Sequence, residues 1–205
     1  MPRSRFHTLP PERQEAILGA ALEEFSAHGF TGASLNRIIA AAGVSKGSLY
    51  YCFDGKEDLY AHLLRVQVER MIARTGPFPV PATTGPDGFW SAIEEYCRRL
   101  VLALDASPQL AGLLRDWMSG TGAPALQAAQ QDAERSALPW LAEALAAGQA
   151  AGAIRTDLPD ALLLAVIAAI GRVIDAWAIA EASGPLDHAA AVHVIVGILR
   201  RAIEP

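Results

Sequence analysis

Residues 34–53 read Ser-Leu-Asn-Arg-Ile-Ile-Ala-Ala-Ala-Gly-Val-Ser-Lys-Gly-Ser-Leu-Tyr-Tyr-Cys-Phe and contain two short helical patterns separated by a tight break. Ser34 can cap the first helix with its hydroxyl, and apolar residues recur behind it at helical spacing. Gly43 stands where this helix must end with a positive φ, which costs glycine little. Ser45 can cap a second helix that runs to about Cys52. A helix, a turn with glycine and a short helix are typical of a helix-turn-helix.

An ordinary helical hairpin is the alternative interpretation of this pattern. The second helix is too short for a hairpin arm, and it carries polar and aromatic residues in place of a wide apolar stripe. We therefore favour nucleic-acid binding.

The second helix would carry most of the contacts to DNA. Lys46 can reach a phosphate or a guanine edge, and Gly47 lets the backbone approach closely. Ser48, Tyr50 and Tyr51 offer hydroxyl groups. For each candidate the alternative role is a solvated surface residue or a helix cap. The candidate DNA-binding residues are Ser34, Arg37, Ser45, Lys46, Gly47, Ser48, Tyr50, Tyr51 and Lys56.

The composition favours an all-α protein. Of 205 residues, 52 % are apolar and 19 % are charged, so the chain can bury a sizeable core. Alanine is abundant, runs of β-branched residues are few, and Asn-Gly or Asp-Gly hairpin turns between alternating strands are lacking. We predict about nine helices, with a three-helix head that carries the helix-turn-helix and a larger C-terminal helical domain.

Cysteine and histidine usage predicts neither a metal nor a cofactor. Cys52 and Cys97 do not make a disulfide framework, and no cluster of Cys and His suggests zinc. A reducing cytoplasm fits this pattern. The longest uninterrupted apolar stretch, 161–171, has eleven residues, whereas a membrane-spanning helix needs roughly twenty. We therefore predict no membrane association.

The net charge of −5 is unevenly distributed along the chain. Residues 1–75 hold nine Lys and Arg against eight Asp and Glu, and residues 76–205 hold eight against fourteen. The acidic surplus therefore belongs to the C-terminal part. Because the N-terminal part is close to neutral, its DNA affinity depends on placing a few cations well.

Proline and glycine mark the domain boundary. We place the DNA-binding domain at residues 1–55 and a connecting helix at about 56–74. Residues 75–88 hold four prolines and three glycines, which indicates a linker or an exposed loop. The second domain then covers residues 75–205.

The last two expected helices, at about 158–182 and 186–203, are apolar over most of their circumference. Such a terminal helix is either central in the core or buried between two copies of the protein, and we favour the second. The candidate interface residues are Val166, Ile170, Ile174, Val192, Ile195, Val196 and Leu199.

The first 60 residues resemble the DNA-binding domain of the tetracycline-repressor (TetR) family of bacterial regulators. The resemblance rests on Ile17-Leu18, Ala21, Phe25, Gly29-Phe30, Ser34, Ile38, the run Ala42 to Tyr50, Phe53, Lys56-Glu57 and Leu59. It implies a cytoplasmic homodimer whose recognition helices enter successive major grooves of a pseudo-palindromic operator, about 34–36 Å apart. It also implies that residues 75–205 serve dimerisation and bind a small molecule that releases DNA.

Polar and aromatic side chains on the apolar helices are candidates for a ligand pocket. Ordinary core packing is the alternative for each. The largely aliphatic and aromatic surroundings predict an apolar ligand held by few polar groups. The candidates are His62, Tyr96, Cys97, Arg115, Trp117, Met118, Trp140, Asp175 and Trp177.

These patterns together predict a ligand-responsive transcriptional repressor. A DNA-binding regulator without a small-molecule ligand is one alternative. A helical enzyme is another, but the sequence lacks a metal cluster, a phosphate-binding glycine loop and a nucleophile elbow, so we predict no enzymatic activity.

Overall fold

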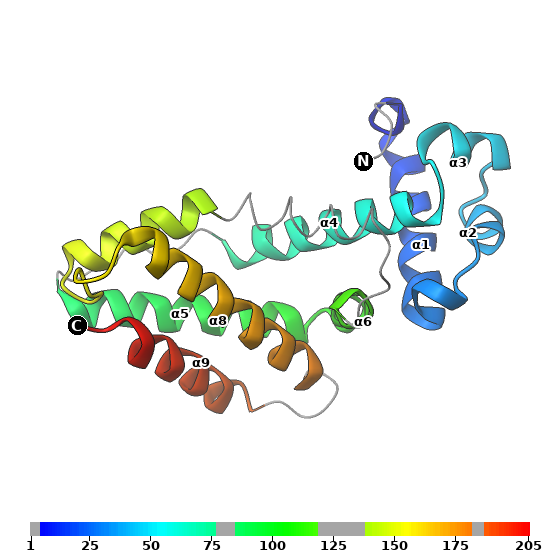
Figure 1. The fold of residues 1–205 in the computed structure, drawn as a ribbon. Helices are drawn as coiled ribbons and strands as arrows, with labels where there is room; N and C mark the ends of the chain where they lie inside the picture. The colour runs from blue at the N-terminus through cyan, green and yellow to red at the C-terminus, as the bar shows by residue number, and fades with distance from the viewer. Residues whose placement is uncertain (1–4, 77–84, 119–137, 182–186) are drawn as a thin grey trace. The chain divides into compact units, whose positions relative to one another are not determined.

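The structure, a computed structural model, describes residues 5–76, 85–118, 138–181 and 187–205 (Figure 1). Within these residues all regular secondary structure is helical, which confirms the all-α prediction. The helices are η1 (Phe6–Thr8), α1 (Pro11–Gly32), α2 (Leu35–Ala41), α3 (Lys46–Cys52), α4 (Lys56–Thr75), α5 (Pro86–Asp105), α6 (Pro108–Met118), α8 (Asp160–Glu181) and α9 (His188–Ile203), together with a helix over 138–150.

The chain divides into two compact units. The first unit is Met1–Arg70 with Pro108–Ala133, and the second unit is Met71–Ser107 with Glu134–Pro205. The division from sequence assigned 108–118 to the C-terminal domain, whereas in the structure α6 packs on α1 in the first unit.

The first unit buries a core contributed by all of its N-terminal helices. Burying one Leu, Ile or Phe side chain stabilises the fold by about 1.5–3 kcal/mol. Helices of seven residues, such as α2 and α3, are marginal alone, so this packing on their neighbours holds them. The side chains at most 2 % exposed include Ile17, Ala21, Phe25, Ile38, Leu49, Leu59 and Leu63.

The C-terminal end of α1 is a fixed kink. Gly29 has φ 64°, in the left-handed region that favours glycine, and the helix then continues to Gly32. The backbone N–H of Phe30 donates to Asp116 Oδ2 of α6 at 2.6 Å. Tyr60 of α4 also reaches α6, because its hydroxyl donates to Leu113 O at 2.8 Å. α6 therefore holds both α1 and α4 in place.

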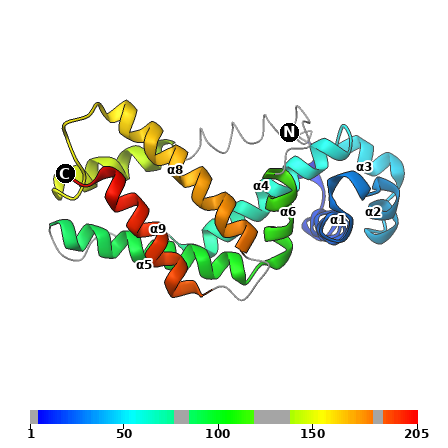
Figure 2. The ribbon, with the colours of Figure 1, turned by 60° about the horizontal axis from the view of Figure 1, so that its bottom comes forward.

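The second unit contains α5, the helix at 138–150, α8 and α9. α5 and α9 pack side by side (Figure 2). A Cβ at Gly148 would lie 2.4 Å from Ile154 Cδ1, so only glycine lets the connection after the 138–150 helix fold back this closely. The backbone N–H of Arg155 donates to Ile203 O at 2.9 Å, which ties that connection to the end of α9.

One face of α9 belongs to the core of the chain itself. Val192, Ile195 and Val196 are 4 %, 6 % and 8 % exposed and pack in one cluster with Phe89 and Trp90 of α5. These three side chains are therefore buried within one chain, and their role in an interface between copies stays a prediction. The apolar pattern had shown that α9 is buried but not which of its faces meets α5.

Part of the surface of α8 and α9 remains apolar and exposed to solvent. Val173 of α8 is 70 % exposed, and Val194 and Ile198 of α9 are 45 % and 41 % exposed. A shallow apolar groove there is lined by Ala169, Ile170, Val173, Ile174 and Ile198. Val166, Ile170, Ile174 and Leu199, the other four candidate interface residues, are half-buried.

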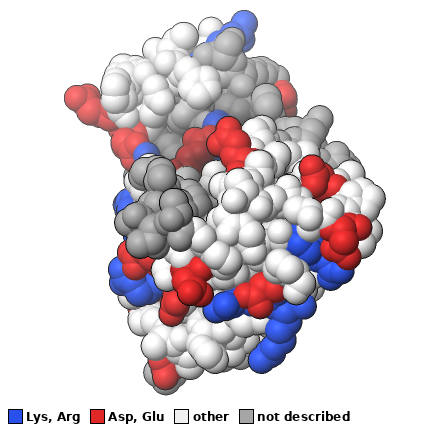
Figure 3. Space-filling model, turned by 90° about the vertical axis from the view of Figure 1, so that its left-hand side faces the viewer, with Lys and Arg blue, Asp and Glu red and all other residues white. Residues whose placement is uncertain are grey.

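α8 also meets the length and composition criteria for a membrane span, over Asp160–Ala180, with only 17 % of its most apolar window buried. One such helix is weak support for a membrane span, because helices of soluble proteins pass the same test. On the surface view of Figure 3, acidic and basic side chains are interspersed rather than separated into fields of one sign.

Candidate nucleic-acid interface

The turn between α2 and α3 has the geometry that its sequence predicts. Gly43 has φ 63°, and the Val44 N–H donates back to Ile39 O at 3.2 Å. Ser45 caps α3, because its hydroxyl accepts the N–H of Ser48 at 3.1 Å. Leu49 points into the core at 1 % exposure, so the opposite side of α3 faces outward.

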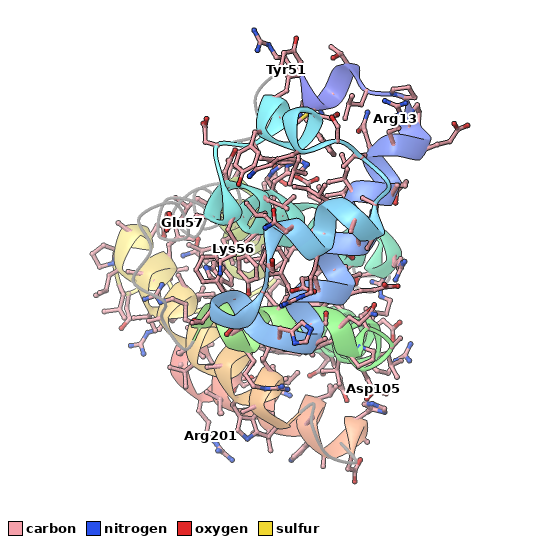
Figure 4. All side chains as sticks on the ribbon, turned by 90° about the vertical axis from the view of Figure 1, so that its right-hand side faces the viewer. Arg13, Tyr51, Lys56, Glu57, Asp105 and Arg201 are labelled. Atoms are coloured by element: carbon pink, nitrogen blue, oxygen red, sulfur yellow. The ribbon has the colours of Figure 1, made fainter. Side chains whose placement is uncertain are left out.

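The outward side of α3 presents one cation and two tyrosines. Tyr50 and Tyr51 are 41 % and 51 % exposed, and Lys46 and Gly47 are exposed at the first turn. Lys46 Nζ lies 5.9 Å from the centroid of the Tyr50 ring, within cation–π range. Figure 4 shows Tyr51 at the outer edge of this region. A positive group and aromatic hydroxyls on a short exposed helix suit phosphate and base-edge contacts.

The segment before α1 adds a second cation to this surface, one that is not among the candidate DNA-binding residues. The guanidinium of Arg5 lies 4.2 Å from the centroid of the Tyr51 ring. Phe6 fixes this position, because it is 1 % exposed and its ring lies 5.1 Å from Phe53 and 4.8 Å from His62. In the sequence, the signal for this anchoring was Phe6, a single aromatic residue among the polar N-terminal residues.

Arg37 and Ser34 are engaged by α1. Arg37 Nε donates to both carboxylate oxygens of Glu24 at 2.8 and 3.0 Å, and these bonds hold the pKa of Glu24 below its ordinary value. The Ser34 N–H donates to the same carboxylate at 2.8 Å. Ser34 is the N-cap residue of α2, as predicted, but its hydroxyl makes no capping bond; Glu24 holds the start of this helix instead.

Lys56 fastens the α1–α2 connection. Its Nζ donates to Thr31 O and Ala33 O, both at 3.1 Å, and lies 4.9 Å from the centroid of the Phe30 ring. Lys56 is half-buried, whereas Tyr51 is exposed; both are labelled in Figure 4. As DNA contacts, Ser34, Arg37 and Lys56 stay predictions, and the structure gives Arg37 and Lys56 a positioning role in addition.

His62 lies in the core of the first unit. It is 3 % exposed and packs against Phe6 and Phe53, while Arg65 Nη2 lies 2.9 Å from its Nδ1. Burial, together with the charge of Arg65, lowers the pKa of His62 to about 4. A neutral, packed imidazole at this place belongs to the core of the head, and the pocket role of His62 stays a prediction.

The other candidate pocket residues fall in both units. In the second unit the rings of Tyr96 and Trp140 lie 5.6 Å apart, and Trp177 is 38 % exposed. Burial raises the pKa of Cys97 to about 11, and desolvation raises the pKa of Asp175 to about 6, although part of the Asp175 side chain is open to solvent. Arg115, Trp117 and Met118 belong to α6 in the first unit, and the Met118 side chain lies outside the described residues.

Metal ligands do not gather in the part of the chain that the structure describes. There, no group of three or more His, Cys, Asp or Glu is placed to hold a metal ion.

Comparison with known proteins identifies the N-terminal region. Residues 17–63 match the family described as "Bacterial regulatory proteins, tetR family". The transcriptional regulator RutR of Escherichia coli K12 is 41 % identical over 86 residues, which are 42 % of this chain and 38 % of RutR. The transcriptional repressor AcnR of Corynebacterium glutamicum is 36 % identical over 62 residues, 30 % of this chain and 33 % of AcnR. The chain thus spans well under half the length of these relatives.

Solved structures extend the likeness of the fold to most of the chain. The fatty acid degradation regulator FadR of Bacillus halodurans has a TM-score of 0.72 at 21 % identity and covers 94 % of this chain and 96 % of its own. FadR of Bacillus subtilis in complex with stearoyl-CoA has a TM-score of 0.67 at 20 % identity, covering 92 % and 98 %.

The capped recognition helix, the glycine turn and the buried supporting core define a helix-turn-helix protein. Its N-terminal region, over residues 17–63, is similar to the tetR family of bacterial regulatory proteins.

Proposed function

We propose that this protein is a homodimeric transcriptional repressor that binds a pseudo-palindromic operator and leaves it when a small, largely apolar molecule binds. The observation that carries the proposal is the outward face of α3, where Lys46, Tyr50 and Tyr51 stand exposed beside the anchored Arg5. Repression as the direction of control follows AcnR, which is named a repressor.

The near-neutral charge of the N-terminal part makes two copies necessary. Residues 1–75 are close to neutral, so each copy supplies few phosphate contacts. Two heads tethered in one dimer bind two half-sites together, and the second contact then forms at high effective concentration. A spacing of about 34–36 Å between recognition helices would match one turn of B-DNA.

The open apolar face of α8 and α9 is the surface we assign to the second copy. Val173, Val194 and Ile198 are exposed in one chain, and the groove beside them is apolar. Large exposed apolar patches mark interaction sites. A two-fold axis across this face would bury each patch against its own copy and form a four-helix contact.

The effector site is proposed in the second unit. Tyr96 and Trp140 supply ring faces, and Asp175 of α8 supplies a polar group. The FadR structure from Bacillus subtilis contains stearoyl-CoA, which has a long apolar chain. We carry over only the apolar character of such a ligand.

The decisive experiment combines genome-wide footprinting with gel retardation on the operator that it finds. The double variant Lys46→Ala, Tyr50→Ala should lose at least about 100-fold in operator affinity, since each lost base or phosphate contact costs about 1–3 kcal/mol. Arg13→Ala is the matched control: Arg13 is also an exposed cation of the first unit, but it lies on α1 (Figure 4). Unchanged retardation by the double variant would show that α3 is not the recognition helix.

The effector is tested separately by thermal unfolding with a panel of apolar compounds. A ligand at 100 times its Kd should stabilise the fold by about 2.7 kcal/mol and should weaken operator retardation. A compound that stabilises the protein but leaves retardation unchanged argues for a regulator without small-molecule control.

A further inference from the structure

The segment from Arg5 to the start of α1 is fixed to the rest of the first unit. Thr8 donates twice to Arg5 O, from its backbone N–H at 3.2 Å and from its hydroxyl at 2.7 Å, and these bonds close the turn of η1. Gln14 Nε2 donates to Leu9 O at 2.8 Å, which ties the same segment to α1. The backbone of Arg5 therefore has a defined position, and its side chain can reach only a limited part of the surface.

Phe6 sets that position against the end of α3. Its ring is buried and packs on the rings of Phe53 and His62, at 5.1 and 4.8 Å. Phe53 is the C-cap residue of α3, so this packing joins the segment directly to the recognition helix. Arg5, the residue before Phe6, is exposed. The buried ring thus holds an exposed cation beside α3.

The Arg5 side chain lies over the face of an exposed ring of α3. Its guanidinium carbon is 4.2 Å from the centroid of the Tyr51 ring, and Tyr51 is 51 % exposed. Such a cation–π contact orients a guanidinium and leaves its charge in place. Within the described residues Arg5 forms no ion pair with a carboxylate. The charge of Arg5 is therefore oriented but not neutralised.

The place of this cation along α3 determines which part of a DNA duplex it meets. In helix-turn-helix proteins the N-terminal residues of the recognition helix contact base edges. In α3 these are Lys46 and Gly47, whereas Tyr51 is the last residue but one. From Lys46 to Tyr51 the helix rises by about 7.5 Å, and the major groove is about 12 Å wide. A cation over Tyr51 is therefore displaced from the base-reading end of α3 toward the wall of the groove, which the phosphate backbone forms.

We propose that Arg5 binds a backbone phosphate at the edge of the major groove, and that Tyr51 acts through its ring as the support that positions Arg5. The proposal rests on the proposed DNA-binding function and adds a contact from outside the helix-turn-helix. A guanidinium that stacks by its face keeps its N–H edge for two phosphate oxygens. Because phosphate contacts carry no sequence information, Arg5 should strengthen binding to every DNA sequence by the same factor.

The test measures binding of the full-length protein to labelled duplexes by fluorescence anisotropy at several salt concentrations. One duplex carries the operator that footprinting finds, and the other has the same base composition in shuffled order. Arg5→Gln should weaken binding to both duplexes by the same factor, about tenfold or more, because each dimer loses two contacts. The slope of log affinity against log salt should become shallower by about 1.8, that is, by about 0.9 for each contact.

Arg13→Gln is the matched control for this loss of charge. Arg13 is an exposed cation of the first unit and lies on α1, away from the Tyr51 ring. Arg13→Gln should therefore leave the affinity and the salt slope close to those of the wild type. Arg5 and Tyr51 are exposed, so their variants should also keep the thermal unfolding of the wild type.

The ring and the hydroxyl of Tyr51 are tested separately. Tyr51→Phe keeps the ring and should bind like the wild type. Tyr51→Ala removes the support of Arg5, so both the affinity and the salt slope should fall, though less than in Arg5→Gln. In the Arg5→Gln background Tyr51→Ala should have no further effect, because it acts through Arg5. A merely structural role of Tyr51 would lower the affinity equally in both backgrounds and leave the salt slope unchanged.

Three results would overturn the proposal. Arg5→Gln could leave both affinities unchanged, or it could weaken the operator alone, which would indicate a base contact in place of a phosphate contact. Tyr51→Phe could weaken binding as much as Tyr51→Ala, which would assign the effect to the hydroxyl. If the wild type binds neither duplex, the DNA-binding function itself is wrong, and this outcome is distinct from a wild type that binds DNA without the help of Arg5.

Discussion

The two units use their apolar side chains in different ways. In the first unit, α1 to α4 direct their large apolar residues into one core, with Ile17, Leu49 and Leu63 almost fully buried. In the second unit, only 17 % of the most apolar window of α8 is buried, and Val173 is 70 % exposed. The first unit is therefore closed by its own side chains, whereas the second leaves an apolar surface exposed, which we propose a second copy covers. The comparison is strongest on α9, where two isoleucines three positions apart differ in burial: Ile195 is 6 % exposed and Ile198 is 41 % exposed.

The largest effect is expected at the inward isoleucine. Ile195→Asp places a carboxylate in the cluster with Phe89 and Trp90 and should cost about 4 kcal/mol or more, because an unpaired charge is buried. Circular dichroism and thermal unfolding should show loss of the cooperative transition of the second unit. If the variant unfolds like the wild type, α9 does not pack in this orientation.

The outward isoleucine should control assembly instead. Ile198 is 41 % exposed and lines the apolar groove, so Ile198→Asp should leave the helical content unchanged. Because a two-fold interface contains each substitution twice, the dimer should weaken by roughly 100-fold or more. Sedimentation equilibrium measures this directly. A stable dimer at wild-type affinity would mean that α9 is not at the interface.

The difference in burial between Ile195 and Ile198 also shows which features can be predicted from the sequence and which cannot. Local features could be predicted: the Ser45 cap, the positive φ of Gly43 and the exposed Lys46 follow from residues within one or two turns of each other. Which face of α9 meets α5 depends on packing between distant segments, which helical periodicity does not encode.

The same limit applies to the charged residues of the head. Arg37 bonds Glu24, thirteen positions away, and Lys56 bonds carbonyls of the α1–α2 connection more than twenty positions away. A sequence pattern shows such cations as surface residues, because their partners become neighbours only when α1 folds back beside them. Arg5 was missed for the same reason, since only the burial of Phe6 brings it over Tyr51.

The closed core of the first unit should give it a characteristic pH dependence. Burial lowers the pKa of His62 to about 4, helped by Arg65 and His7 and opposed by Asp58. The unfolded state then binds a proton more readily than the folded state, so the stability is complete above about pH 6.5 and falls as the pH approaches 4. Between about pH 7 and about pH 4.5 this loss should be about 2 kcal/mol.

Urea unfolding followed by hydrogen exchange in α3 and α4 tests this dependence. His62→Leu removes the titrating group and should flatten the pH profile of the first unit, whatever it does to absolute stability. The control is His28→Gln, at an exposed histidine of α1 beside Glu24. A profile that stays as steep in His62→Leu as in the wild type would assign the effect to other groups.

The smallest effect is expected where α6 fastens the first unit. Asp116→Ala removes the acceptor of the Phe30 N–H at 2.6 Å and a longer contact with the Tyr60 hydroxyl at 3.4 Å. A half-buried donor left without its charged partner costs about 1–3 kcal/mol, and we expect the lower end because water can reach the site. Hydrogen exchange should quicken at residues 29–33 and stay unchanged in the second unit.

Glu69→Ala, which breaks only the exposed pair with Arg65, should change stability by at most about 0.5 kcal/mol. Equal effects of the two substitutions would show that α6 does not fix the kink of α1, and the closure of the first unit would then rest on its apolar core alone.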